Sequence, residues 1–97
     1  MIDYEKLAAA CGLTYLDGVT VKYFDSHEGR ELVEEKVREL CPGPVQITYY
    51  NGSVAVELLT ANNGSVGGMW NCVKSVSSET KFSAFATALV WLAERKG

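Results

Sequence analysis

The Asn51-Gly52 pair, which separates two stretches of alternating apolar and polar residues, constrains the fold more than any other feature of the chain. Asn-Gly is the preferred pair for a two-residue β-hairpin turn. Closing this turn pairs residues 45–50 with residues 53–58 and brings apolar side chains together on one side of the hairpin. The facing pairs are Val45 with Leu58, Ile47 with Val56, and Tyr49 with Val54. Because turn, pattern and register agree, the sequence predicts an antiparallel hairpin with one apolar face.

Three segments carry the signals of helices. The first begins after Asp3, which can cap it, and stops at Gly12. The second begins at a capping box formed by Asp25 and Glu28 and runs to about Leu40, where a Pro-Gly-Pro sequence ends it. The third lies near the C-terminus and carries an apolar stripe at helical spacing. The stripe consists of Phe82, Phe85, Ala86, Leu89, Leu92 and Ala93.

Two further segments show the alternation that is typical of strands. Val19, Val21 and Tyr23 alternate with polar residues, and residues 69–76 follow a glycine-rich loop at residues 60–68. The sequence thus predicts one α+β domain over residues 1–97, in the order α-β-α-β-β-β-α. Its antiparallel sheet would have three to four strands and would pack with two to three helices.

The net charge of −3 is unevenly distributed along the chain. Residues 1–40 carry nine acids and five bases, whereas residues 41–97 carry three acids and four bases. A phosphate-binding surface needs clustered lysine and arginine, so we expect no direct binding of nucleic acid. The chain has no apolar run of membrane-spanning length and no signal-peptide pattern, which predicts a cytoplasmic protein that does not enter the membrane.

The residue types that carry most enzyme chemistry are sparse. The three cysteines form no C-x-x-C motif, and an odd number of them fits free thiols in a reducing compartment. The single histidine, His27, lies among acids at a helix start, where adjacent positions rarely converge on one metal ion. We therefore expect no catalytic residue, no metal site and no cofactor. An enzyme that uses Cys72 or His27 is the minority alternative.

Four glutamates line one face of the second predicted helix and form a continuous acidic ridge. These are Glu28, Glu31, Glu35 and Glu39, with Leu32 among them. An ordinary solvated helix face is one interpretation. The other is a partner-binding surface made of all five residues, which would occupy a basic groove on another protein because carboxylates along one face can stand in for phosphates.

The last predicted helix offers a second candidate surface. Ala84, Ala88 and Trp91 share a face opposite the apolar stripe, and small residues beside a tryptophan can form a shallow groove with an aromatic anchor. Two interpretations remain open at this point. The face can be an oligomer interface, giving a homodimer, or it can complete a second core within the chain.

The C-terminal segment resembles small bacteriophage and prophage proteins of the "phage ABA sandwich" type. The resemblance rests on a strand bearing Met69-Trp70, the sequence Ser78-Glu79-Thr80, and a helix with the pattern Thr-x3-Ala-x3-Ala-Leu-x2-Leu. Several anti-CRISPR and other anti-defence proteins have a similar sheet-then-helix ending. The resemblance implies a small accessory protein that works by binding, and no catalytic residue is carried over from it.

These observations lead to two hypotheses of function. The first is a small, acidic, non-catalytic binding protein, a phage-encoded inhibitor of a host defence complex that uses the acidic helix face against a basic surface. The alternative is an oligomeric protein that binds or sequesters a small ligand such as a nucleotide second messenger. Its subunits would join through Trp91, and the loop at residues 60–68 would close over the ligand with its backbone amides.

Overall fold

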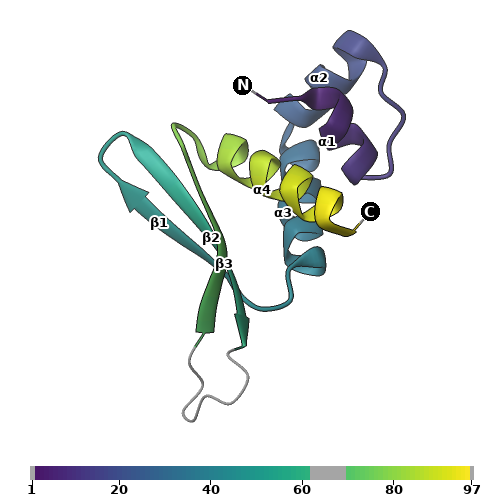
Figure 1. Ribbon diagram of the computed structural model, residues 1–97. Helices are drawn as coiled ribbons and strands as arrows, with labels where there is room; N and C mark the ends of the chain where they lie inside the picture. The colour runs from purple at the N-terminus through teal and green to yellow at the C-terminus, as the bar shows by residue number, and fades with distance from the viewer. Residues whose placement is uncertain (1, 62–69, 97) are drawn as a thin grey trace.

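The computed structural model describes residues 2–61 and 70–96, which form a three-stranded antiparallel sheet and four helices (Figure 1). The strands are β1 (Val45–Tyr50), β2 (Ser53–Ala61) and β3 (Trp70–Ser78), in the spatial order β1-β2-β3. The helices are α1 (Tyr4–Ala10), α2 (Asp17–Asp25), α3 (His27–Leu40) and α4 (Lys81–Lys96). The predicted α+β class with an antiparallel sheet is confirmed.

The predicted hairpin register is also confirmed. Val45 pairs with Leu58, Ile47 with Val56, and Tyr49 with Val54. Gly52 alone of the two turn residues takes a positive φ, of 86°, so the glycine supplies the left-handed conformation that the turn requires. β3 then pairs with the other edge of β2, and a bulge falls between Leu58 and Leu59.

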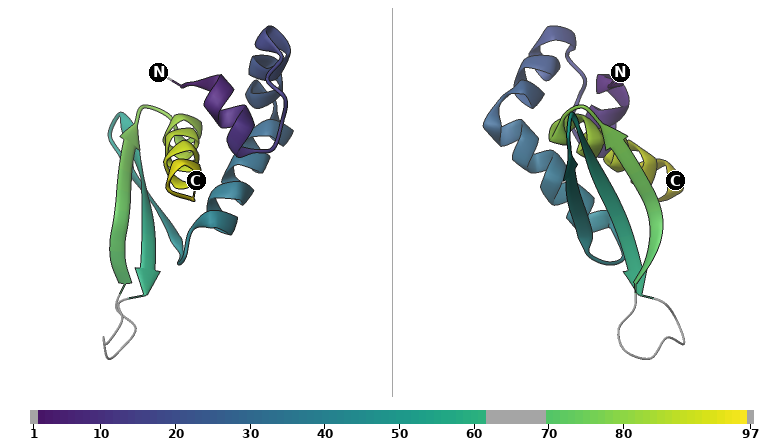
Figure 2. Two further views of the ribbon diagram at one scale, coloured as in Figure 1. Left: turned by 45° about the vertical axis from the view of Figure 1, so that its right-hand side comes forward. Right: turned by 90° about the vertical axis from the view of Figure 1, so that its left-hand side faces the viewer.

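The helices form two layers on one face of the sheet. α4 packs against β2 and β3, and α1 and α3 pack against the side of α4 that faces away from the sheet (Figure 2). No described helix covers the opposite face of the sheet (Figure 2). α4 is therefore enclosed on two sides, and most of its surface lies in the core. The largest fully buried side chains are Phe24, Phe85, Leu7, Leu58 and Leu89.

Residues 17–25 form a helix, so the predicted strand at residues 19–23 is wrong. The buried side chains of α2 are Thr20 and Phe24, which lie four residues apart and therefore share one helix face. The backbone N–H of Leu16 donates a hydrogen bond of 2.6 Å to Thr20 Oγ1, which secures the first turn. The alternating valines do not point into a sheet, and Val19 is 67% exposed. The element order is α-α-α-β-β-β-α, with four helices rather than two or three.

The helix ends follow the sequence signals with one shift. Asp3 caps α1 by accepting from the backbone N–H of Lys6 at 3.1 Å, and α1 ends just before Gly12, whose φ is 74°. α3 is capped by Ser26, whose hydroxyl accepts from the backbone N–H of Gly29, and not by a box of Asp25 and Glu28. The predicted end of α3 at Leu40 is confirmed.

Candidate interaction surfaces

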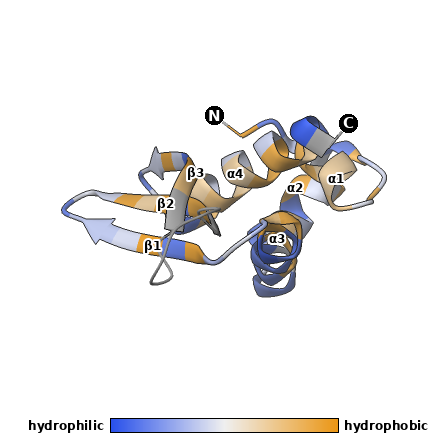
Figure 3. Ribbon diagram, turned by 60° about the horizontal axis from the view of Figure 1, so that its bottom comes forward, coloured by the Kyte–Doolittle hydropathy of each residue, from blue (hydrophilic) through white to orange (hydrophobic). Residues whose placement is uncertain are grey.

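The acidic ridge lies on the outer face of α3. The glutamates of the ridge (Glu28, Glu31, Glu35 and Glu39) are all exposed. In Figure 3, where α3 is seen nearly end-on, hydrophilic residues occupy the side turned away from α4. Val33 and Val37, on the opposite side of the helix, are fully buried. The helical period thus separates a core face from a carboxylate face, as the sequence predicted.

The negative charge of the ridge is only partly offset by neighbours. His27 Nε2 lies 3.1 Å from a Glu31 carboxylate oxygen, and Lys36 Nζ lies 3.7 Å from one of Glu39. Glu28 and Glu35 form no ion pair with any described group. The surface therefore retains negative charge.

Leu32 differs from the sequence expectation. It is half-buried and packs against the core cluster, so it is not a freely exposed apolar contact within the ridge. Its position on α3 is at the border between the buried face and the carboxylates. The ridge is consequently a charged surface with no apolar centre of its own.

Glu34 is an acid with a different environment. Its side chain is 20% exposed and lies 3.5 Å from Lys81 Nζ of α4 and 3.8 Å from Arg38 of α3. This carboxylate ties α3 to the start of α4. Glu34 is therefore a structural residue, although it directly precedes Glu35 of the ridge.

The expected surface groove of Ala84, Ala88 and Trp91 is corrected by the structure. Ala84 and Ala88 are both 0% exposed and belong to the core cluster, because α4 is enclosed between the sheet and the other helices. Trp91 alone of the three reaches the surface, and it is half-buried. The packing of the two alanines is that of the intrachain alternative.

Trp91 lines a hollow of about 420 Å³ between the end of α4 and the strand ends. Arg95 Cζ lies 4.7 Å and Lys74 Nζ 5.6 Å from the centroid of the indole ring, so two cations flank one aromatic side chain. Thr60 also lines the hollow. Residues 62–68 of the predicted loop lie outside the described residues, and its first two residues, Thr60 and Ala61, belong to β2.

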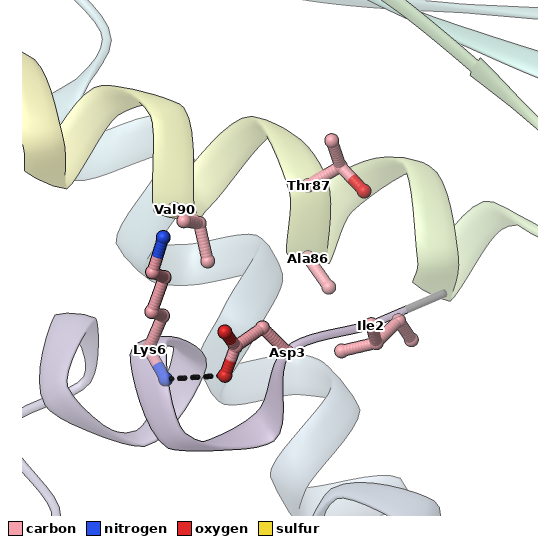
Figure 4. Close-up of a pocket in the computed structure, with 6 residues that line it drawn as sticks. All are labelled: Ile2, Asp3, Lys6, Ala86, Thr87 and Val90. Carbon is pink, nitrogen blue, oxygen red and sulfur yellow. Dashed lines mark hydrogen bonds between the residues drawn. The ribbon is translucent and has the colours of Figure 1, made fainter.

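A second hollow, of about 160 Å³, lies in the seam between α1 and α4 and is shown in Figure 4. The carboxylate of Asp3 in this hollow is engaged by the backbone N–H of Lys6 as the helix cap. Above it, Lys6 Nζ lies 3.7 Å from a carboxylate oxygen of Glu94 on α4. The bond to Asp3 lies within α1, whereas the ion pair of Lys6 with Glu94 crosses the seam between two exposed side chains.

An apolar patch on the α1–α2 connection and α2 was not predicted. It consists of three exposed large side chains, Leu13, Leu16 and Val19. A groove of about 330 Å³ lies among Leu13, Leu16, Val19 and neighbouring residues. Sequence reasoning missed this patch because it assigned the valines to a half-buried strand. The sequence pattern that favours a helix over a strand here is the four-residue spacing of Thr20 and Phe24, which places both side chains on one helix face.

The candidate nucleophiles and the histidine do not form a constellation. Burial raises the pKa of the Cys11 thiol to about 11, which keeps it protonated and weakly nucleophilic at neutral pH. Cys72 is exposed on β3, whereas His27 lies at the start of α3 and pairs with Glu31. Within the described ranges, no three His, Cys, Asp or Glu side chains are grouped as metal ligands.

Among the helices described, none combines the length and apolar character needed to cross a bilayer.

Comparison with known proteins gave no match to a family model, to a curated protein or to a solved structure.

Proposed function

We propose that this chain is a non-catalytic binding protein whose acidic ridge docks onto a basic surface of another protein. The observation that carries the proposal is the contrast between Glu34 and its neighbour Glu35. The first is shielded and paired with two cations, whereas the second is exposed and, like Glu28, free of ion pairs with described groups. Unpaired surface charge of one sign steers association and selects a partner of the opposite sign.

The length of the ridge supports a more specific target. From Glu28 to Glu39 the helix rises by roughly 16 Å, at about 1.5 Å per residue. One strand of nucleic acid places about five phosphates over a similar length, at roughly 3.4 Å each. Four carboxylates on this face would therefore compete for a groove that normally holds a nucleic acid backbone. In keeping with the resemblance to small phage proteins, the proposed target is such a groove in a host defence complex.

Competition for labelled DNA tests the proposal directly. The probe is a purified CRISPR effector complex with fluorescent target DNA, and the readout is the anisotropy of the DNA as the chain is added. The chain should displace the DNA, and the double variant Glu31→Lys/Glu35→Lys should fail to do so. The control, Glu57→Lys/Glu79→Lys, changes the net charge equally but lies away from α3, and it should displace DNA like the natural chain. Equal behaviour of the two double variants, or no displacement by the natural chain, would contradict the proposal.

A second candidate function, binding of a small anionic ligand such as a nucleotide, is favoured by the hollow at Trp91. Arg95 and Lys74 flank the indole and form no ion pair with a described carboxylate. This function ranks second because α3 and α4 both end near the hollow, and the carbonyl groups of helix C-termini oppose an anion. Cyclic dinucleotides should raise the melting temperature of the natural chain and not of Arg95→Gln. The absence of any shift at millimolar ligand would remove this candidate.

A further inference from the structure

The two edges of the sheet differ in how they are protected against further pairing. β1 and β3 are both edge strands, because the strands lie in the order β1-β2-β3. An edge strand has unpaired backbone N–H and C=O groups, and proteins commonly protect such an edge with a charged side chain, a proline or a bulge. β3 has two of these devices. Lys74 lies in the middle of the strand, and the pairing with β2 skips Val73, which therefore forms a bulge.

β1 has none of these devices. Its sequence, Val45–Tyr50, contains no charged residue and no proline, and its pairing with β2 runs from end to end without a shift. Among the described strands only β2 pairs with it. The described helices all lie on one face of the sheet, so none of them continues the layer of strands beyond β1 (Figure 2). In the part of the chain that the structure describes, the outer edge of β1 is therefore open to a further strand.

The geometry of the hairpin identifies the backbone groups at this edge. In a two-residue hairpin the residues that flank the turn, here Tyr50 and Ser53, exchange both backbone hydrogen bonds. Bonded and non-bonded pairs then alternate along the two strands. Val45, Ile47 and Tyr49 therefore direct their backbone N–H and C=O groups away from β2. Beyond the sheet itself, no backbone hydrogen bond among the described residues engages these groups.

The side chains of the same three residues form an apolar row that the helices leave partly uncovered. They lie on the helix side of the sheet, because their partners on β2 are buried core residues. α4 packs against β2 and β3 and leaves β1 at its margin. Val45 and Ile47 are accordingly half-buried, and Tyr49 is 67% exposed. A further strand beside β1 would cover this row.

A second copy of β1 matches this edge. Antiparallel pairing centred on Ile47 sets Ile47 of the two copies against each other and Val45 against Tyr49. This register engages all the outward backbone groups, forms about six hydrogen bonds, and places apolar side chains against apolar ones. Because β1 has no charged residue, the symmetric contact brings no like charges of this strand together. We infer that the chain forms a twofold-symmetric dimer in which the two β1 strands pair and join the two sheets into one.

The dimer presents two acidic ridges on one side. Its twofold axis is perpendicular to the joined sheet, so the helix layers of both copies lie on the same face. Two linked binding surfaces engage a target that has two matching sites more tightly than one surface does. This consequence rests on the proposed function, whereas the interface itself lies on β1 and does not depend on the role of α3.

Sedimentation velocity of the full chain tests the dimer and its register. The natural chain should shift from monomer to dimer over about a hundredfold range of concentration that ends near 0.5 mM. Gln46 and Thr48 lie on the open face of β1 and face each other across the interface. Gln46→Lys/Thr48→Lys sets lysine against lysine and should raise the dissociation constant of the dimer by about tenfold. Gln46→Lys/Thr48→Glu changes the same positions but sets lysine against glutamate, so its dissociation constant should stay within about threefold of the natural one.

Two further variants locate the interface on β1. Ser75→Lys/Ser77→Lys adds two lysines to the open face of β3, where both serines are exposed, and should change the dissociation constant by less than about threefold. Tyr49→Pro removes an N–H that points to the free edge and no hydrogen bond of the β1–β2 pair, so the hairpin is kept and the dimer should be lost. Circular dichroism verifies that each variant is folded.

Four results would overturn the inference. The first is a natural chain that stays monomeric at the highest concentration, and the second is equal dimerisation of the lysine–lysine and lysine–glutamate variants of β1. The third is loss of the dimer in Ser75→Lys/Ser77→Lys together with its retention in a folded Tyr49→Pro chain, which would move the interface to β3. The fourth is a series of species that keeps growing with concentration, because β1 would then pair with β3 in an open chain. Each of these results would leave the proposed function standing, and failure of the chain to displace DNA would leave the dimer standing.

Discussion

At the scale of single residues, Gly29 shows how one position fixes the junction between two helices. A Cβ atom built at Gly29 would collide with the backbone oxygen of Tyr23 and approach the Cα of Phe24 to 2.8 Å. Both obstacles are main-chain atoms, which cannot move aside as a flexible side chain can. The start of α3 and the end of α2 can therefore lie this close together only because residue 29 has no side chain.

Gly29→Ala should lower the free energy of unfolding by about 2 kcal/mol or more, because the backbone of α2 must shift to admit the methyl group. Urea denaturation measures the change. Gly18→Ala is the matched control, since a Cβ at Gly18 meets nothing within 4 Å. That substitution should stabilise the chain by about 0.5 to 1 kcal/mol through the backbone entropy of the unfolded state. Equal effects of the two substitutions would show that α2 and α3 do not pack as described.

At the scale of elements, the predictable parts of the fold are those whose signals are local. The register of the β1–β2 hairpin follows from a short turn and a two-residue period, both of which are visible in the sequence. Val19 and Val21 show the limit of such reasoning, because their alternation favours a strand while the burial of Phe24 on a helical face decides the outcome. Propensity was overridden by a tertiary contact that no local pattern displays.

The same distinction applies to the candidate site. The carboxylates of the ridge share one side of α3, which the helical period predicts from sequence alone. Whether Leu32 points outward or packs inward depends on which elements pack beside α3, and the period does not reveal that. The packing of α4 beside α3 also decides that Glu34 is a paired structural residue while Glu35 is exposed.

Glu34 and Glu35 provide a test of that division at adjacent positions. Glu34→Gln should lower the free energy of unfolding by about 1 kcal/mol, because two cations lose their shielded partner. Glu35→Gln should change it by less than about 0.5 kcal/mol. A double-mutant cycle with Lys81→Met, followed by urea denaturation, measures the coupling between α3 and α4. A coupling of zero would contradict the assignment of Glu34 as the tie between the two helices.

At the scale of the whole molecule, the fold consists of a sheet, a central helix and an outer layer of helices. α4 is buried on two sides, by the sheet and by the outer helices. Its small residues therefore pack in the core, whereas on a helix covered by a sheet alone they would face solvent. Phe82 and Phe85 face the outer helices, since the Phe82 ring lies 6.4 Å from that of Phe24 on α2 and Arg38 of α3 lies 5.8 Å from the Phe85 ring. Ala84 and Ala88 share the other face with Trp91, which lies beside Lys74 of β3, so these small residues allow the sheet to approach α4 closely. The open face of the sheet, the acidic ridge and the apolar patch remain as the surfaces that a partner can reach.

Ala88→Leu tests this layered arrangement. Ala88 is 0% exposed, so the added atoms must displace a neighbouring layer, and the free energy of unfolding should fall by about 1 to 3 kcal/mol. Thr87→Leu is the matched control, because Thr87 is exposed on the same turn of α4 and the change should lie within about 0.5 kcal/mol. Sedimentation of both variants separates this arrangement from the alternative in which residue 88 lies in an oligomer interface. A variant Ala88→Leu that kept full stability and changed only the oligomeric state would place α4 at the surface and contradict the enclosure of this helix.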